Sequence, residues 1–197
     1  NCVATAALAW RRPVVSELVA VTLGTGIGGG LVAGGRLLRG ARGFAGEPGH
    51  MVIVPDGLPC VCGQRGCWER YASGTALSEM AEVAFNAGRV RSATTSEGTP
   101  VGSGERLVAL ARTGQRAAAE VISQYAGYLA LGIANLMNLL DPELVVISGG
   151  VALALDVMLE PIRAELSSNP TVADRLPLVE AAPFADAAGA VGAATTA

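Results

Sequence analysis

The feature that most constrains this chain is a short loop that carries four residues of the types that bind metals. The three cysteines Cys60, Cys62 and Cys67 follow His50, the only histidine. The stretch 55–67 is rich in Pro, Asp and Gly and has little periodicity, so we expect a loop. Structural zinc takes four sulfur or nitrogen ligands in a tetrahedron, and three cysteines with one histidine are a common set. The sequence therefore predicts a structural Zn²⁺ in this loop.

The competing interpretation is three free thiols beside an unrelated histidine. Residues 1–20 lack the basic start, apolar stretch and cleavage site of a secretory signal, and no apolar run is long enough to span a bilayer. We therefore expect a soluble cytoplasmic protein, in which metal ligation is favoured over disulfides. Because the protein would fill all four ligand positions, none is left for a catalytic water.

Two acidic residues, Glu47 and Glu69, flank the loop. A metal-bound histidine uses one ring nitrogen and keeps the other N–H as a hydrogen-bond donor. Two carboxylates that accept and one imidazole that donates suit the hydroxyl groups of a polyol. The alternative is that both are ordinary surface or helix-start acids, and spacing alone favours that alternative.

Composition narrows the class of protein. The chain has 197 residues, 51% of them hydrophobic and 16% charged, as in a globular protein with one good core or two small lobes. The net charge of −3 and the lack of a basic cluster argue against nucleic acid as a partner of this chain. All 14 basic residues are arginine, so no lysine can clamp a phosphate. The first residue is Asn1 and not methionine, which predicts a fragment or a processed product.

Periodicity predicts an α/β protein. The expected strands are 17–23 and 27–32, which form a hairpin or meander, the apolar run within 142–150, which ends in two glycines, and 176–180. The expected helices are 3–10, 74–87, 105–140 with a break near Gly114, 154–167 and 186–197, and 88–104 is an exposed connection. A strand, helix, strand, helix order after a hairpin predicts a sheet with at least two parallel strands.

Two glycine-rich turns follow predicted strands. "LGTGIGGG" is no dinucleotide fingerprint, because another β run follows it and not a helix, and a plain hairpin would look similar. Its backbone N–H groups, with the hydroxyls of Thr22 and Thr25, can still hold phosphate oxygens without a lysine. "SGG" ends a buried strand, where ligands of α/β sheets gather. We expect one nucleotide between the turns, at Gly24, Thr25 and Gly26 and at Gly149 and Gly150.

The combination of motifs resembles the ROK family of repressors and sugar kinases. The family hallmark is E-x-G-H followed by C-x-C-G-x-x-G-C-x-E, and this chain has "GEPGH" and then "CVCGQRGCWE". "LGTGIGGG" resembles the second phosphate-binding turn of the family, and "VVISGG" is similar to its adenosine-binding turn. Within the family, the chain is most similar to bacterial glucokinases of the actinobacterial type.

The resemblance implies an actin-like ATPase (ribonuclease H-like) fold. Residues 1–197 would form a single C-terminal lobe that includes the zinc loop, residues 50–67, and the N-terminal ATP-binding lobe with its D-x-G-G-T turn is absent from the chain. The resemblance also implies a homo-oligomer that phosphorylates glucose at the 6-hydroxyl with ATP and Mg²⁺. The implied zinc ligands are His50, Cys60, Cys62 and Cys67, and the implied sugar-binding residues are Asn1, Glu47, His50 and Glu69.

One departure from the family lies at the start of the chain. "NCVATAALAW" resembles the family segment "NDANAAALAE", in which the Asn binds sugar and the Asp is the general base. Asn1 matches, but Cys2 stands at the position of the base and Ala4 replaces the second Asn. A thiol with a pKa of about 8.5 is a poor substitute for a carboxylate. We therefore expect this chain alone to have little or no kinase activity.

Three alternatives stay open at this point. The chain could be the sugar-sensing part of a ROK repressor whose DNA-binding helices precede Asn1, although a sensor does not need the intact phosphate turn. It could be a degenerate pseudo-kinase that keeps the fold and the zinc. It could also prefer N-acetylmannosamine or fructose, because one contact can decide hexose identity.

Overall fold

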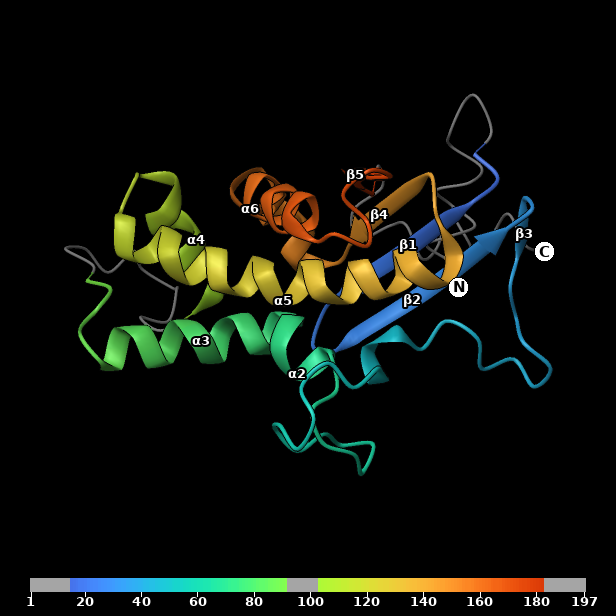
Figure 1. Cartoon of the computed structure of the whole chain (residues 1–197). Coiled ribbons are helices and arrows are strands. Elements are labelled where there is room, and N and C mark those ends of the chain that lie inside the picture. The colour runs from blue at the N-terminus through green and yellow to red at the C-terminus, as the bar shows by residue number, and fades with distance from the viewer. Residues whose placement is uncertain (1–14, 92–102, 183–197) are drawn as a thin grey trace.

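The computed structural model describes residues 15–91 and 103–182 and contains a mixed sheet packed against helices (Figure 1). The five strands have the order β3-β2-β1-β4-β5. β1 is antiparallel to β2 and parallel to β4, and β4 is parallel to β5, so the predicted hairpin and parallel strands are confirmed. The strands are β1 Leu18–Leu23, β2 Ile27–Ala33, β3 Arg36–Leu37, β4 Leu144–Ser148 and β5 Leu178–Ala181.

The helices agree with the predicted ranges within one or two residues at most ends. The expected break near Gly114 separates α4 from α5, where this glycine has a φ of +82°. Three short elements, η1, α2 and η2, were not predicted, and the expected helices 3–10 and 186–197 lie outside the described residues. The helical elements are η1 Pro48–His50, α2 Glu69–Ala72, α3 Gly74–Asn86, α4 Gly104–Arg112, α5 Arg116–Leu140, η2 Gly150–Ala154 and α6 Leu155–Ser168.

The main core lies between one face of the sheet and the helices. Alternate residues of β1 and β4, such as Val21 and Ile147, point into it and are almost fully buried. α5 lies between α6 on one side and the α2–α3 pair on the other (Figure 1). Its sequence is apolar on most sides, so it is buried along most of its length, as predicted. None of the helices in the described ranges is long and apolar enough to cross a bilayer.

The end of the zinc loop is anchored on α5. Trp68 is fully buried, and its indole Nε1 donates a 2.8 Å hydrogen bond to the carbonyl oxygen of Tyr128. Gly132 makes room for the indole, because a Cβ at this position would collide with it. One helical turn after Trp68, the carbonyl oxygen of Ala72 accepts a 2.7 Å hydrogen bond from the hydroxyl of Tyr125, and burial raises the pKa of Tyr125. α2 therefore has a fixed position against the core.

The two glycine turns lie side by side at the same end of the sheet. β1 and β4 are parallel neighbours, and their last paired residues are Thr22 and Ser148. The hydroxyl oxygens of these residues are 2.9 Å apart and share a hydrogen bond. Gly149 follows with a φ of +83°, and a Cβ there would collide with the carbonyl oxygen of Leu23. Only glycine allows the second turn to pack this closely on the first.

Candidate functional site

The structure brings the four predicted metal ligands together. The ligand atoms of His50, Cys60, Cys62 and Cys67 all lie within 4.8 Å of one another. Cys62 Sγ and Cys67 Sγ are 3.6 Å apart, and Cys60 Sγ is 3.8 Å from His50 Nδ1. Tetrahedral zinc with bonds of 2.0 to 2.3 Å separates its ligands by about 3.3 to 3.8 Å. The donor set therefore fits a Zn²⁺ ion, and these two ligand pairs have the spacing that tetrahedral zinc requires.

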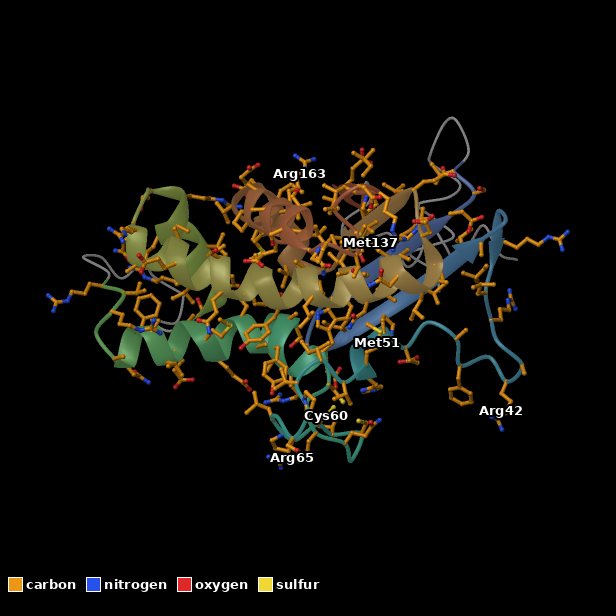
Figure 2. All side chains as sticks on the ribbon, viewed as in Figure 1. Arg42, Met51, Cys60, Arg65, Met137 and Arg163 are labelled. Carbon is orange, nitrogen blue, oxygen red and sulfur yellow. The ribbon has the colours of Figure 1, made fainter. Side chains whose placement is uncertain are left out.

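Two glycines give the zinc loop its shape. The loop projects away from α5, as the labelled Cys60 and Arg65 show (Figure 2). Gly63 and Gly66 have φ values of +91° and +79°, which L side chains rarely adopt. Gly66 also donates to the carbonyl oxygen of Leu58 at 2.8 Å. These turns bring the second and third thiols to the same side of the loop.

Without metal, the thiols differ in their acidity. Burial, together with the bond to the Glu69 carboxylate, raises the pKa of Cys60 to about 12, and burial raises the pKa of Cys67. The backbone N–H of Gln64 lowers the pKa of Cys62. Zinc binds thiolates, so metal binding must release these protons.

Glu69 connects the zinc loop to the sheet. Its Oε1 accepts from Cys60 Sγ at 3.0 Å and lies 3.7 Å from His50 Nδ1. Its Oε2 accepts from the backbone N–H of Ile27 at 3.4 Å. The same oxygen would be 2.5 Å from a Cβ at Gly26, so a side chain there would displace the carboxylate. The carboxylate is thus held between the loop and the β1–β2 turn.

The imidazole of His50 turns Nδ1 to the cysteines, which leaves Nε2 on the opposite edge of the ring as a hydrogen-bond donor. Its side chain is 37% exposed, while that of Glu69 is 14% exposed. Glu47 is exposed and precedes η1, and its carbonyl oxygen accepts from the His50 N–H at 3.3 Å. The structure thus brings His50 and Glu69 into proximity and Glu47 to the start of the same short turn.

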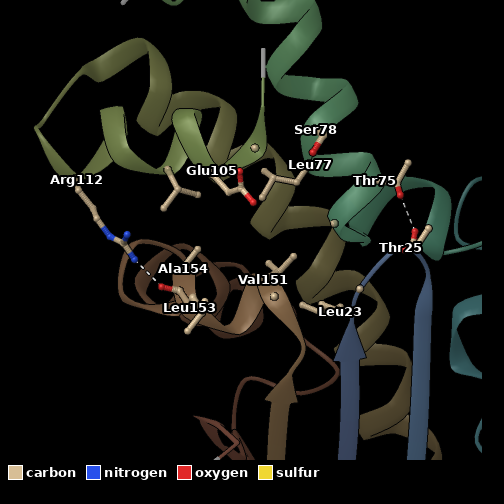
Figure 3. Close-up of a pocket in the computed structure, with 15 residues that line it drawn as sticks. Leu23, Thr25, Thr75, Leu77, Ser78, Glu105, Arg112, Val151, Leu153 and Ala154 are labelled. Atoms are coloured by element: carbon tan, nitrogen blue, oxygen red, sulfur yellow. Dashed lines mark hydrogen bonds between the residues drawn. The ribbon is translucent and has the colours of Figure 1, made fainter. Parts of the chain in front are cut away.

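A pocket of about 640 Å³ lies at the end of the sheet where the glycine turns meet (Figure 3). The predicted residues Gly24, Thr25 and Gly150 line it. Gly26 and Gly149 are not part of its lining: the first lies against Glu69 and the second against Leu23. The complete lining is Leu23, Gly24, Thr25, Gly74, Thr75, Leu77, Ser78, Gly104, Glu105, Val108, Arg112, Gly150, Val151, Leu153 and Ala154.

Polar contacts hold both ends of this pocket (Figure 3). At one end, the Arg112 guanidinium donates to the Asp156 carboxylate at 2.8 and 2.7 Å and to the carbonyl oxygen of Leu153. Hydrogen bonding to Arg112 lowers the pKa of Asp156. At the other end, the Thr75 hydroxyl donates to the carbonyl oxygen of Thr25 at 2.8 Å. The middle of the pocket is mostly apolar, a lining that suits a nucleobase.

Sequence analysis did not identify the contribution of α3 and α4 to this pocket. Thr75 lies in the first turn of α3, and Arg112 ends α4. A Ser residue before each helix was an available signal, because Ser73 and Ser103 both cap helix starts. A capping Ser marks where a helix starts, but it does not show which pocket or surface that helix start lines. The predicted residues Asn1 and Cys2 lie outside the described residues.

Comparison with known proteins identifies one family for the whole chain and relatives of two kinds, glucokinases and repressors. A match described as the ROK family covers residues 1–197. The chain is 39% identical over 184 residues to a glucokinase of Streptomyces coelicolor, which covers 90% of this chain and 58% of that protein. It is 31% identical over 159 residues to a xylose repressor of Caldicellulosiruptor bescii, which covers 81% of this chain and 40% of that protein.

Among solved structures, a ROK family glucokinase from Streptomyces griseus in complex with glucose and AMPPNP is 35% identical to this chain. The two align with a TM-score of 0.81 over 100% of this chain and 66% of the other. The chain thus spans less than two thirds of the length of these relatives.

Proposed function

The chain belongs to the ROK family and has the predicted actin-like ATPase fold, and from this premise we propose that it is the C-terminal lobe of an ATP-dependent sugar kinase. Glucose is the proposed substrate and its 6-hydroxyl the proposed acceptor. The similarity to glucokinases of two Streptomyces species supports this choice over other hexoses.

One observation carries the proposal: the β1–β2 turn takes part in both candidate sites. Gly24 and Thr25 line the pocket, while the next two residues, Gly26 and Ile27, contact the Glu69 carboxylate. A sugar kinase must hold the acceptor hydroxyl next to the terminal phosphate of the nucleotide. Because the turn contacts both sites, a phosphate bound at the turn would lie next to a sugar bound at Glu69.

Each residue has a role in this proposal. Glu69 accepts hydrogen bonds from hexose hydroxyls, and His50 Nε2 donates one, with Asn1 and Glu47 as further sugar ligands. The turn N–H groups bind phosphate oxygens, and Mg²⁺ supplies charge neutralisation on the nucleotide. The 6-hydroxyl oxygen bonds to the γ-phosphorus, the bond to ADP breaks, and the hydroxyl proton goes to a base. Zinc on the three cysteines and His50 stabilises the loop and takes no part in this step.

The residue at the position of the general base is the feature that most limits catalysis by this chain. Cys2 stands where the family resemblance puts an aspartate, and loss of a positioned base costs on the order of 10² to 10⁴ in rate. Little or no turnover is therefore the proposed state of the chain by itself. Retained sugar affinity without turnover would make it a pseudo-kinase.

A sensing role is the second candidate. It is supported by the 31% identity to a xylose repressor and by Cys2, since a sensor needs no base. The intact lining of the pocket by both glycine turns favours the kinase.

The test is to express the chain together with any residues that its gene encodes before Asn1. We expect glucose- and ATP-dependent formation of glucose 6-phosphate, and a rate that rises about 10²-fold or more in Cys2→Asp. Sugar-dependent DNA binding without phosphorylation of any hexose, also in the Cys2→Asp variant, would favour the repressor and contradict the proposal.

A further inference from the structure

The backbone of the β1–β2 turn is held from one side by the start of α3. Gly74 N–H donates to the carbonyl oxygen of Gly24 at 2.7 Å, and the Thr75 hydroxyl donates to the carbonyl oxygen of Thr25 at 2.8 Å. Figure 3 shows the second bond at the end of the pocket. Two consecutive carbonyl groups of the turn therefore point to α3.

The orientation of these carbonyls fixes the N–H groups that follow them. In a trans peptide the N–H lies opposite the carbonyl across a rigid plane. The Thr25 N–H and the Gly26 N–H therefore point away from α3, and within the described ranges neither donates a hydrogen bond to the protein. Two adjacent backbone N–H groups that point in one direction form an anion-binding nest.

The Thr75 hydroxyl has no other structural task in the described structure. Ser73 caps α3, because its Oγ accepts from the N–H of Ala76 at 3.1 Å. The Thr75 side chain instead crosses to Thr25, fifty residues earlier in the chain. Thr25 is exposed, so without this bond water could hydrogen-bond to its carbonyl oxygen instead, and the Thr25–Gly26 peptide could rotate.

We infer that Thr75 is a positioning residue that holds the Thr25–Gly26 peptide, at the edge of the pocket next to the lining residue Thr25, so that the Gly26 N–H reaches the phosphate chain of the nucleotide. This inference rests on the proposed function and extends it to a pocket residue that acts through the backbone of the β1–β2 turn. Glu69 contacts the same turn from the sugar side, at Gly26 and Ile27, and does not contact the Thr25 carbonyl. We therefore expect loss of the Thr75 hydroxyl to weaken phosphate binding more than sugar binding.

The experiment measures binding of AMPPNP with Mg²⁺, and of glucose, to the full chain loaded with zinc. Thr75→Val keeps the shape of the side chain and the branched Cβ but removes the hydroxyl, and Thr75→Ser restores it. Thr171→Val is a matched control, because the hydroxyl of Thr171 also makes a 2.8 Å hydrogen bond, to Asn169, but lies outside the pocket. Amide NMR of Gly26 reports the turn itself, and circular dichroism reports folding.

We expect Thr75→Val to weaken AMPPNP binding about tenfold and to reduce the shift of the Gly26 amide on binding. Glucose affinity should stay within about twofold, and Thr75→Ser and Thr171→Val should resemble the wild type. If Thr75→Val binds AMPPNP as the wild type does, the inference is wrong and the proposed function stands. If the wild-type chain binds glucose but no AMPPNP, the nucleotide part of the proposed function fails as well. Should Thr75→Val not fold, the Thr75→Ala variant gives the same comparison.

Discussion

The indole of Trp68 fills the space above Gly132 that a side chain on α5 would need. Trp68 follows the last candidate zinc ligand, Cys67, and precedes Glu69, so this contact decides where the candidate sugar-binding carboxylate lies. We predict that Gly132→Ala lowers the free energy of unfolding by about 1–3 kcal/mol, because the added methyl group overpacks the core. Urea unfolding measures the change, and glucose binding should weaken with it.

The control for this substitution lies on the same helix. At Gly127 the nearest atoms to an added Cβ are those of the Glu165 carboxylate, at 3.9 Å, so nothing must move. Gly127→Ala should be neutral or stabilising by up to about 1 kcal/mol, since alanine is the better helix former. Equal changes in the free energy of unfolding for the two substitutions would contradict a specific stabilising role of the Trp68–Gly132 contact.

The carboxylate of Glu69 is predicted to bind the hexose. Glu69→Gln keeps one oxygen for the Ile27 N–H but loses the charge, and we expect glucose affinity to fall by about tenfold or more. Titration calorimetry measures the loss. Glu120→Gln is the matched control, because Glu120 is exposed and pairs with Arg116 one turn earlier on α5, so this variant should bind glucose normally. Unchanged affinity in Glu69→Gln would remove this residue from the site.

The zinc loop should carry one metal ion per chain. We expect mass spectrometry of the native protein to find one Zn²⁺, and its removal with a strong chelator to leave the helix content nearly unchanged. The ligands lie on a loop that projects from the core, so the sheet and α5 do not depend on the metal. A Cys62→Ala variant should lose most of its zinc. Full zinc content in this variant would argue against Cys62 as a ligand.

The ion pair between Arg112 and Asp156 gives a small dependence of stability on pH. Hydrogen bonding to Arg112 lowers the pKa of Asp156 in the folded chain, so the contribution is present above the unfolded pKa and disappears as the pH falls through the folded one. Both side chains are about half exposed, so Asp156→Asn should cost less than about 1 kcal/mol at pH 7. Urea unfolding of both proteins at pH 7 and at a series of lower pH values should show the difference shrink as Asp156 becomes protonated in the folded chain. A difference that persists at low pH would assign it to another cause.

Local patterns were sufficient to predict much of the architecture. The hairpin, the parallel strand β4 and the break at Gly114 each follow from periodicity and turn residues within a few positions. The metal cluster was also predictable, because its ligands lie close together in the sequence. The Trp68–Gly132 contact and the bond from Thr75 to Thr25 were not, since each joins residues at least fifty positions apart. α2 was not predicted because its four residues make only about one helical turn, which is too short to show a repeating pattern.

The most direct test of the account is calorimetric titration of glucose, with xylose in parallel, into the chain with zinc bound and with zinc removed. The account predicts that glucose binds more tightly than xylose to the zinc-loaded chain, and that binding is lost without zinc and returns when Zn²⁺ is added back. Glucose binding of equal strength with and without zinc, or a preference for xylose, would contradict a zinc-supported glucose site built on His50 and Glu69.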